Sequence, residues 1–340
     1  MDTKIYLYFI TYLITASPSV ASLCSIRDDG QCFYTVICNN PRLIPTEPAC
    51  KDSNIFVTLT INNSTALNIT ANYYTSHYDP WVRIFNAIGF SWTFVHSYAF
   101  HNFKNVLYID ISQNKIKSIG SAFKGLKQLD SLNLSRNRLE VIDPDSFIIS
   151  NYNNRLYLLD LSYNLLSYLP ERLFQYLLRL KKLYLQGNQM IVLQEEYSRY
   201  FKKLSYLNLC CNNMRLFNAT LKHSVWLKEL NLSFNELKQV NISPLLFLET
   251  INLSHNKIEE FVFDTFEKSP CLTKVDFSFN HLTKLFRITN KKVYSYVNAH
   301  LMHLDFDNNK ISYIDSNFFL TFKYISYLNL SYNEITEFNP

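Results

Sequence analysis

The chain is poor in glycine, in charge of one sign and in long apolar runs, and each shortage excludes a class of protein. Its five glycines in 340 residues form no loop that could cradle a phosphate group. The net charge of +5 comes from interspersed signs, without the concentrated basic stripe of a nucleic-acid-binding surface. No stretch approaches the roughly 18 apolar residues that cross a bilayer. We therefore expect neither a nucleic-acid partner nor a membrane span in this chain.

Clustered catalytic side chains are also missing. The eight histidines are scattered, and no serine, histidine and acid or cysteine and base combination has a fixed spacing. His300 and His303 lie three positions apart at an expected strand, so they would point to opposite faces. Three carboxylates are expected to face outward from neighbouring repeats: Asp276, Asp305 and Asp307. Such positions are commonly solvated, so we expect these side chains to face water and not to bind a cation. We expect no enzyme, no cofactor and no metal site.

What the sequence does contain is one motif repeated ten times between Val106 and Pro340. Each copy reads L-x-x-L-x-L-x-x-N-x-L, with other apolar residues at some leucine positions and an asparagine that is never replaced. We call these asparagines the rungs. Their spacing of 21–29 residues matches the leucine-rich repeat. The rungs are Asn114, Asn137, Asn164, Asn188, Asn212, Asn235, Asn256, Asn280, Asn309 and Asn333.

The motif predicts an α/β-type repeat solenoid. The alternating residues around the middle leucine form a short strand with one face inward, and neighbouring turns must stack to bury those leucines. The rung amide can donate and accept, so it can satisfy backbone groups buried where the chain turns. We expect a leucine-rich repeat horseshoe with a parallel concave β-sheet and an irregular or short-helical convex side. Phenylalanines fourteen residues before a rung should pack that convex wall: Phe100, Phe123, Phe174, Phe266 and Phe319.

Four segments are expected along the chain. Residues 1–21 resemble a secretory signal peptide, with a ten-residue apolar run too short to span a bilayer and small residues before the expected cleavage site. Residues 22–54 form a Cys-rich N-terminal cap, 55–97 one or two degenerate opening repeats, and 98–340 the solenoid. We expect that the protein continues beyond Pro340 or that another chain covers its last turn.

Seven cysteines suit an oxidising compartment. Four of them would form two disulfides in the cap, with the pairing left open: Cys24, Cys32, Cys38 and Cys50. Cys210, Cys211 and Cys271 remain, and three turns separate Cys210 from Cys271, too far for a disulfide. Two interpretations stay open: a disulfide-linked dimer through Cys210, Cys211 or Cys271, or cysteines that are free or locally paired.

Nine Asn-x-Ser/Thr sequons predict glycosylation of a secreted chain. They begin at Asn62, Asn63, Asn68, Asn133, Asn218, Asn231, Asn241, Asn252 and Asn329. Four of these lie between two strand leucines on the concave face: Asn133, Asn231, Asn252 and Asn329. An equally good interpretation is that these four sequons are ordinary repeat composition and carry no glycan. If they carry glycans at the second, sixth, seventh and tenth rungs, the third to fifth turns stay open.

The third to fifth turns therefore contain the predicted ligand face. Tyrosine offers contact area and a hydroxyl group at little entropic cost, and it is enriched in binding hot spots. We call the six outward residues of these turns the window: Tyr157, Tyr163, Lys182, Tyr184, Gln186 and Tyr206.

The chain resembles extracellular leucine-rich repeat proteins over some two thirds of its length, from Val106 to Phe338. The signal peptide, the segment 32–36 and the size of the ladder are similar to the leucine-rich repeat immune proteins of mosquitoes. That resemblance implies a secreted recognition protein of innate immunity that binds a protein or a microbial surface ligand. The alternative is the ectodomain of a cell-surface adhesion molecule or Toll-like receptor, which shares the same ladder.

Overall fold

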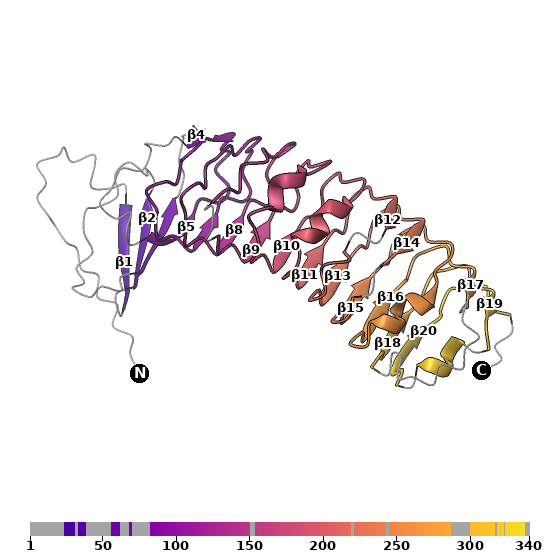
Figure 1. The fold of residues 1–340 in the computed structure, drawn as a ribbon. Helices are drawn as coiled ribbons and strands as arrows, with labels where there is room; N and C mark the ends of the chain where they lie inside the picture. The colour runs from indigo at the N-terminus through magenta and orange to yellow at the C-terminus, as the bar shows by residue number, and fades with distance from the viewer. Residues whose placement is uncertain are drawn as a thin grey trace, which may run out of the picture.

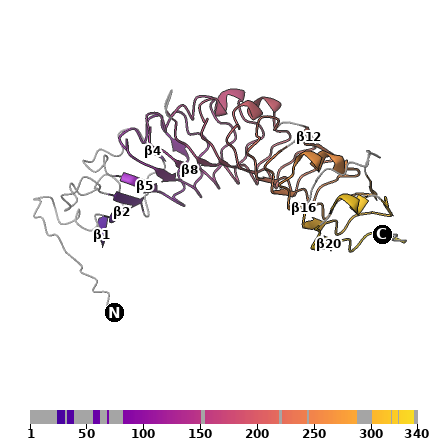
Figure 2. The ribbon, with the colours of Figure 1, turned by 60° about the horizontal axis from the view of Figure 1, so that its bottom comes forward.

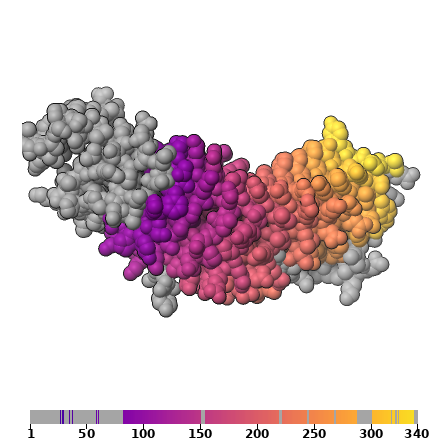
Figure 3. All heavy atoms as spheres, turned by 90° about the horizontal axis from the view of Figure 1, so that it is seen from above, coloured from indigo at the N-terminus to yellow at the C-terminus, as the bar shows by residue number. Residues whose placement is uncertain are grey.

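The computed structural model describes residues 24–30, 33–38, 56–61, 68–69, 82–149, 154–218, 221–242, 245–286, 300–316, 318–322 and 324–336. The described chain winds into successive coils that stack side by side along an arc (Figure 1). Neighbouring coils touch without gaps in the space-filling view (Figure 3). The expected horseshoe-type solenoid is confirmed.

Fourteen strands of the described residues form one sheet along the inner side of the arc. Each strand of the repeats has only three residues and pairs in parallel, in register, with the strand of the next turn. From the ladder onward they are β7 (Tyr108–Asp110), β8 (Ser131–Asn133), β9 (Leu158–Asp160), β10 (Lys182–Tyr184), β11 (Tyr206–Asn208), β13 (Glu229–Asn231), β15 (Thr250–Asn252), β16 (Lys274–Asp276), β18 (His303–Asp305) and β20 (Tyr327–Asn329).

The middle residue of each repeat strand points into the core. Leu132, Leu159 and Leu183 are fully buried, while the residues on either side of each are half-buried and face outward. This alternation follows from the two-residue period of a strand. One coil cannot cover its own leucines, so the core is continuous from turn to turn.

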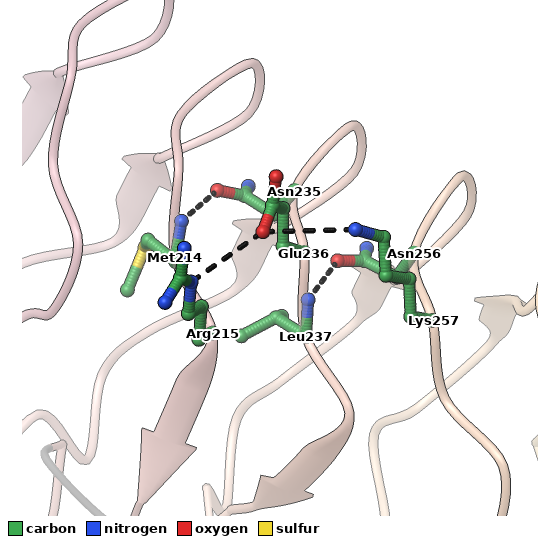
Figure 4. Close-up of polar contacts among 7 residues, drawn as sticks. All are labelled: Met214, Arg215, Asn235, Glu236, Leu237, Asn256 and Lys257. Carbon is green, nitrogen blue, oxygen red and sulfur yellow. Dashed lines mark hydrogen bonds and ion pairs between the residues drawn. The ribbon is translucent and has the colours of Figure 1, made fainter.

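The rung asparagines hold neighbouring coils together (Figure 4). The Asn235 side-chain nitrogen donates to the carbonyls of Leu232 in its own turn and Leu209 in the preceding turn, both at 3.0 Å. Its oxygen accepts from Met214 N–H of the preceding turn at 3.1 Å. Leu209 O also accepts from the Asn212 side chain, so this carbonyl accepts hydrogen bonds from two successive rungs. The predicted donor and acceptor roles are both present.

The outer side of the arc has short 3₁₀ helices and small two-stranded sheets (Figure 2). The helices are η2 (Glu171–Phe174), η3 (Glu195–Arg199), η4 (Phe263–Lys268) and η5 (Phe318–Thr321). The small sheets pair β4 (Asn68–Ile69) with β6 (Phe94–Val95), β12 (Leu216–Asn218) with β14 (Gln239–Asn241), and β17 (Lys284–Leu285) with β19 (Tyr313–Ile314).

Aromatic rings fill the space beneath this outer wall. Phe100 and Phe123 stack with centroids 5.6 Å apart, and Phe174 packs edge-on against Phe201 at 4.9 Å. Phe266 is also buried. In the last of these turns the fully buried ring is Phe318, and Phe319 is only partly buried. The fourteen-residue spacing before the rung therefore locates the phenylalanines that pack the convex wall to within one residue.

The turn before the first rung lacks the asparagine yet keeps the coil geometry. Phe90 stands at the rung position, 24 residues before Asn114, and its ring stacks on Trp92 at 5.5 Å. The Asn114 oxygen accepts from the backbone N–H groups of Phe90 and Trp92. β5 (Val82–Asn86) of this turn pairs in parallel with β7. This turn is a degenerate repeat in structural terms, although the limits expected for the segments remain predictions.

The sheet continues toward the N-terminus with β3 (Phe56–Ile61), β2 (Phe33–Cys38) and β1 (Cys24–Gly30). β1 and β2 are antiparallel, and their register places Cys24 opposite Cys38. The disulfide pairing stays a prediction, and Cys32, Cys50 and the signal segment 1–21 lie outside the described residues.

Replacing one rung by an apolar residue should destabilise the solenoid. In Asn235→Leu, Met214 N–H loses its acceptor, and the Leu209 and Leu232 carbonyls each lose one of two donors. An orphaned buried donor costs about 1–3 kcal/mol, so we expect the unfolding free energy to fall by about 2 kcal/mol. Urea denaturation followed by circular dichroism measures it.

The adjacent residue provides the control. Glu236 contacts Arg215 of the preceding turn at 3.5 Å and Lys257 of the following turn at 3.6 Å, with more than 40% of each side chain exposed. Exposed ion pairs contribute about 0–1 kcal/mol, so Glu236→Gln should shift the midpoint little. Equal losses in the two variants would mean that the rung hydrogen bonds do not stabilise the coil stack.

Candidate ligand-binding face

The register of the sheet aligns outward side chains into two columns across the concave face. In the third to fifth turns the first column reads Leu158, Lys182 and Tyr206, and the second reads Asp160, Tyr184 and Asn208. Adjacent strands lie about 4.8 Å apart, so side chains from neighbouring turns can contact each other. A ligand lying along the arc would meet residues that are more than twenty positions apart in the sequence.

The centre of the window is a pair of tyrosines on adjacent strands. The rings of Tyr184 and Tyr206 lie 4.9 Å apart at 40°. Both side chains are half-buried. Burial raises the pKa of both phenols above the usual value. Both hydroxyl groups therefore remain neutral hydrogen-bonding groups at physiological pH.

Two further tyrosines mark the edges of the window. Tyr157 lies just before β9, with Lys181 Nζ 5.5 Å from its ring centroid. Tyr163 lies beyond the same strand, is 44% exposed, and has the Arg136 guanidinium 4.5 Å over its ring. Such cation–π contacts contribute about 0.5–1 kcal/mol at exposed sites. The window thus spans the width of the sheet, from the edge where strands begin to the edge where they end.

Gly187 allows the Tyr163 ring to lie flat against the next turn. Its φ is +68°, in the left-handed region, and a Cβ there would sit 2.4 Å from Tyr163 Cδ1. Beside it, Gln186 Oε1 is buried without a hydrogen-bond partner among the described residues. The window therefore contains a buried acceptor that the described residues leave unsatisfied.

Acidic groups border the tyrosines. Burial raises the pKa of the Asp160 carboxyl, and nearby Asp110 adds to the rise, while hydrogen bonds from Ser162 and the charge of Arg136 oppose it. Asp160 Oδ1 accepts from Ser162 N–H at 2.9 Å. On the same face Glu229 is directly paired with Tyr206. The arrangement offers aromatic, cationic and anionic contacts for binding.

The structure also shows two aromatic stacks that the sequence analysis missed. The residue immediately before each rung has a positive φ, and these residues form a row along one edge of the sheet. In this row His255 lies between Phe234 at 4.0 Å and Phe279 at 4.3 Å, and both phenylalanines are exposed. At the position nine residues before the rung, Trp226 stacks on Phe247 at 4.6 Å. Comparing equivalent positions between repeats would have found both stacks.

The sequons on the concave face have a structural role as well. Asn231 Oδ1 accepts from Ser233 N–H and Oγ, and Asn252 and Asn329 accept from the N–H two residues on. Asn133 differs because its Nδ2 also donates to Asp110 Oδ2 at 2.9 Å. Two other sequon asparagines, Asn218 and Asn241, are exposed and face each other in the β12–β14 pair. Asn62 and Asn63 lie outside the described residues, and nothing is described of the Asn68 side chain.

The side chains considered above as metal ligands make other contacts in the structure. His303 stacks on Tyr327 at 4.1 Å, and burial lowers its pKa, with Lys274 adding to the effect. Asp276 and Asp305 are directly paired, and each carboxylate accepts from the backbone two residues on. Among the described residues, no three His, Cys, Asp or Glu side chains are grouped to hold a metal ion.

Comparisons with known proteins agree with this geometry. A family model described as leucine rich repeat matches residues 91–139 and 131–190, and further leucine-rich repeat models match 223–239 and 247–269. The chain is a leucine-rich repeat protein. Within the described part of this leucine-rich repeat chain, no helix has the length and apolarity needed to cross a membrane.

Relatives are found by sequence and by structure. Lumican of Gallus gallus is 37% identical over 169 residues, covering 47% of this chain and 46% of lumican. Osteomodulin of Bos taurus is 29% identical over 223 residues, covering 64% and 49%. The chain thus spans about half the length of these curated relatives.

Solved structures of the APL1 leucine-rich repeat domain and the LRIM1/APL1C complex have the same fold. The first has a TM-score of 0.66 and 20% identity, covering 88% of this chain and 75% of that one. The second has a TM-score of 0.53 and 17% identity, covering 86% and 52%. These are mosquito immune proteins of the expected kind, so the resemblance is confirmed at the level of the fold.

Gly187→Ala should disturb the window through Tyr163. A left-handed φ costs a non-glycine residue about 1–2 kcal/mol, and the new Cβ would displace the Tyr163 ring from Arg136. We expect a loss of about 1–2 kcal/mol of stability by chemical denaturation. Adding Tyr163→Ala should restore part of it, and a double variant as unstable as the sum of the two would show that the ring is not displaced.

Glycopeptide mass spectrometry of the secreted protein tests the sequons. We expect occupied sites at Asn231, Asn252 and Asn329, whose Nδ2 atoms have no protein acceptor among the described residues. Asn133 should be less occupied because a glycan would compete with its bond to Asp110. Full occupancy of Asn133 with none at Asn231 would refute this assignment.

Proposed function

We propose that this chain is a secreted recognition protein that binds a partner protein through the concave face of its third to fifth turns. The observation that carries the proposal is the Tyr184–Tyr206 pair, with rings 4.9 Å apart on adjacent strands. Half-buried tyrosines of this kind lose little entropy on binding and are enriched in hot spots.

Three features of the surroundings support the same face. Lys182 lies directly beside Tyr206, and Asp160 beside Tyr184, so charges of both signs border the aromatic pair. The Gln186 side chain belongs to the same face, and its buried Oε1 has no hydrogen-bond partner among the described residues. None of the strands β9 to β11 carries an Asn-x-Ser/Thr sequon, whereas the flanking β8 and β13 do. Glycans there would border the face without covering it.

Secretion and an immune role complete the proposal. The expected signal peptide at residues 1–21 and the likeness to extracellular lumican and to the mosquito immune proteins support them. A solved complex contains LRIM1 with APL1C, so proteins of this fold bind other proteins. The alternative is the ectodomain of a cell-surface adhesion molecule, which would use the same face.

The experiment compares two pairs of tyrosines. Tyr184→Ala with Tyr206→Ala removes the aromatic pair, while Tyr168→Ala with Tyr313→Ala removes two exposed tyrosines outside the concave sheet. Each tagged, secreted protein is incubated with extracellular fluid of the source organism, and captured proteins are quantified by mass spectrometry. Because hot-spot truncation costs about 2 kcal/mol or more, we expect capture to fall at least about tenfold in the first variant only.

Secretion yield and circular dichroism of the two variants confirm that both are folded. Unchanged capture by the Tyr184→Ala, Tyr206→Ala protein would reject the window as the ligand face. Equal loss in both pairs would indicate a general surface effect of removing tyrosine.

A further inference from the structure

Two adjacent cysteines lie at the edge of the concave face, just beyond β11. Cys210 is half-buried, Cys211 is exposed, and their sulfur atoms are 3.3 Å apart. Successive side chains normally point to opposite faces of a strand. Here Cys211 has a φ of +56°, which ends the strand geometry and brings the two thiols to the same side.

The coil imposes this conformation on the pair. The equivalent residues of the two adjoining turns, Gly187 and Phe234, also have left-handed φ values, +68° and +53°. Cys210 N–H donates to Asn208 Oδ1 at 3.1 Å, and Cys211 N–H donates to Ser233 O at 3.0 Å. The Cys210 carbonyl accepts from Gly187 N–H and from the Asn212 side chain. The backbone on both sides of the pair is therefore held by the adjoining turns.

The third cysteine cannot compete for either sulfur within the chain. Cys271 lies three residues before β16 begins at Lys274. In the sheet, β13 and β15 lie between β11 and β16. Three strand spacings amount to about 14 Å, whereas a disulfide needs Cα atoms within about 7 Å. Among the described cysteines, the partner within reach of Cys210 is Cys211.

We propose that Cys210 and Cys211 form a vicinal disulfide in the secreted protein, made by exchange with a low-molecular-weight disulfide of the glutathione class. The inference goes beyond the ligand face and rests on that proposal only for entry into the oxidising secretory pathway. It also changes the expected dimer, because both sulfurs would be occupied and Cys271 alone would remain for pairing with another chain.

The reaction is a two-step thiol–disulfide exchange. The Cys211 thiol loses its proton to solvent, and its thiolate attacks one sulfur of the small disulfide, releasing one small thiolate. Cys210 then loses its proton and attacks Cys211 Sγ, releasing the second small thiolate. The two cysteine thiols are oxidised by two electrons, and one small disulfide is reduced to two thiols.

The surroundings assign the order of attack. Burial raises the pKa of the Cys210 thiol to about 12, with neighbouring Cys211 adding to the rise. The thiolate is the attacking form, so the exposed Cys211 reacts first with an incoming disulfide. Cys210 reacts second, when its target sulfur is already within 3.3 Å in the folded chain.

The bond should be easily reduced. Adjacent Cα atoms are about 3.8 Å apart across a trans peptide, below the usual range of about 4.4–6.8 Å for disulfides. Strained and exposed disulfides have more oxidising potentials than structural ones. The ring closed by this disulfide would lie between Gly187 and Phe234, in the row of residues that immediately precede the rungs, next to the window. Its redox state would thus alter the border of the proposed ligand face.

Trypsin digestion gives a direct test. Cleavage after Lys203 and Arg215 releases one peptide with both residues and no other cysteine, while Cys271 falls in a different peptide. The secreted protein is denatured at harvest in the presence of iodoacetamide, so that every free thiol is exposed to the reagent, and is digested without reductant. We expect this peptide unalkylated and about 2 Da lighter than its dithiol form. Alkylation of both cysteines would overturn the proposal.

Two further measurements separate the alternatives. The protein is also equilibrated in buffers with graded ratios of reduced to oxidised glutathione. The Cys210–Cys211 bond should be reduced, and its thiols alkylated, at a more oxidising ratio than the disulfides predicted for the N-terminal cap. Cys271→Ser should leave the peptide unchanged, and Cys211→Ser should leave Cys210 reduced and alkylated. A wild-type dimer on a non-reducing gel that Cys211→Ser abolishes would instead place Cys211 between chains. None of these readouts depends on ligand binding, so failure of the proposed ligand face would not affect them.

Discussion

The fold depends on hydrogen bonds that each coil makes with its neighbour through one asparagine. Each rung side chain donates to carbonyls of two turns and accepts from the N–H of the turn before it, as Asn235 does with Leu232, Leu209 and Met214. Because a coil this short cannot pair its own turning backbone, it is stable only against another coil. Inward leucines add the apolar part of the same constraint, since their burial also needs two adjoining turns.

This constraint creates a surface suited to binding. With the inner side of each repeat strand occupied by leucine, isoleucine or valine and the turn occupied by asparagine, the outward positions are free to vary. The register then places side chains from successive turns in contact, as in the Tyr184–Tyr206 pair and the Phe234–His255–Phe279 stack. The relatives share the scaffold, and a shared scaffold does not by itself determine what the outward residues bind.

Most of the architecture could be predicted from the sequence because the repeat period is local. The ten rungs, the inward leucines and the parallel sheet follow directly from the motif. The turn of Phe90 was harder, since phenylalanine replaces the asparagine and only the backbone shows that the coil persists. The phenylalanines that pack the convex wall were located to within one residue. Phe318 and Phe319 are both apolar, and only packing selects Phe318 for the core.

The sequence by itself determined that this chain stacks short coils and which face of each strand is buried, because a period of two within a period of about 24 encodes both. Only the tertiary structure decided which exposed groups meet. The left-handed φ before each rung aims Cys211 at Cys210 and aligns aromatic rings across turns, and Gly187 leaves room for Tyr163. These contacts depend on the distance and rotation between neighbouring coils, which no single repeat contains.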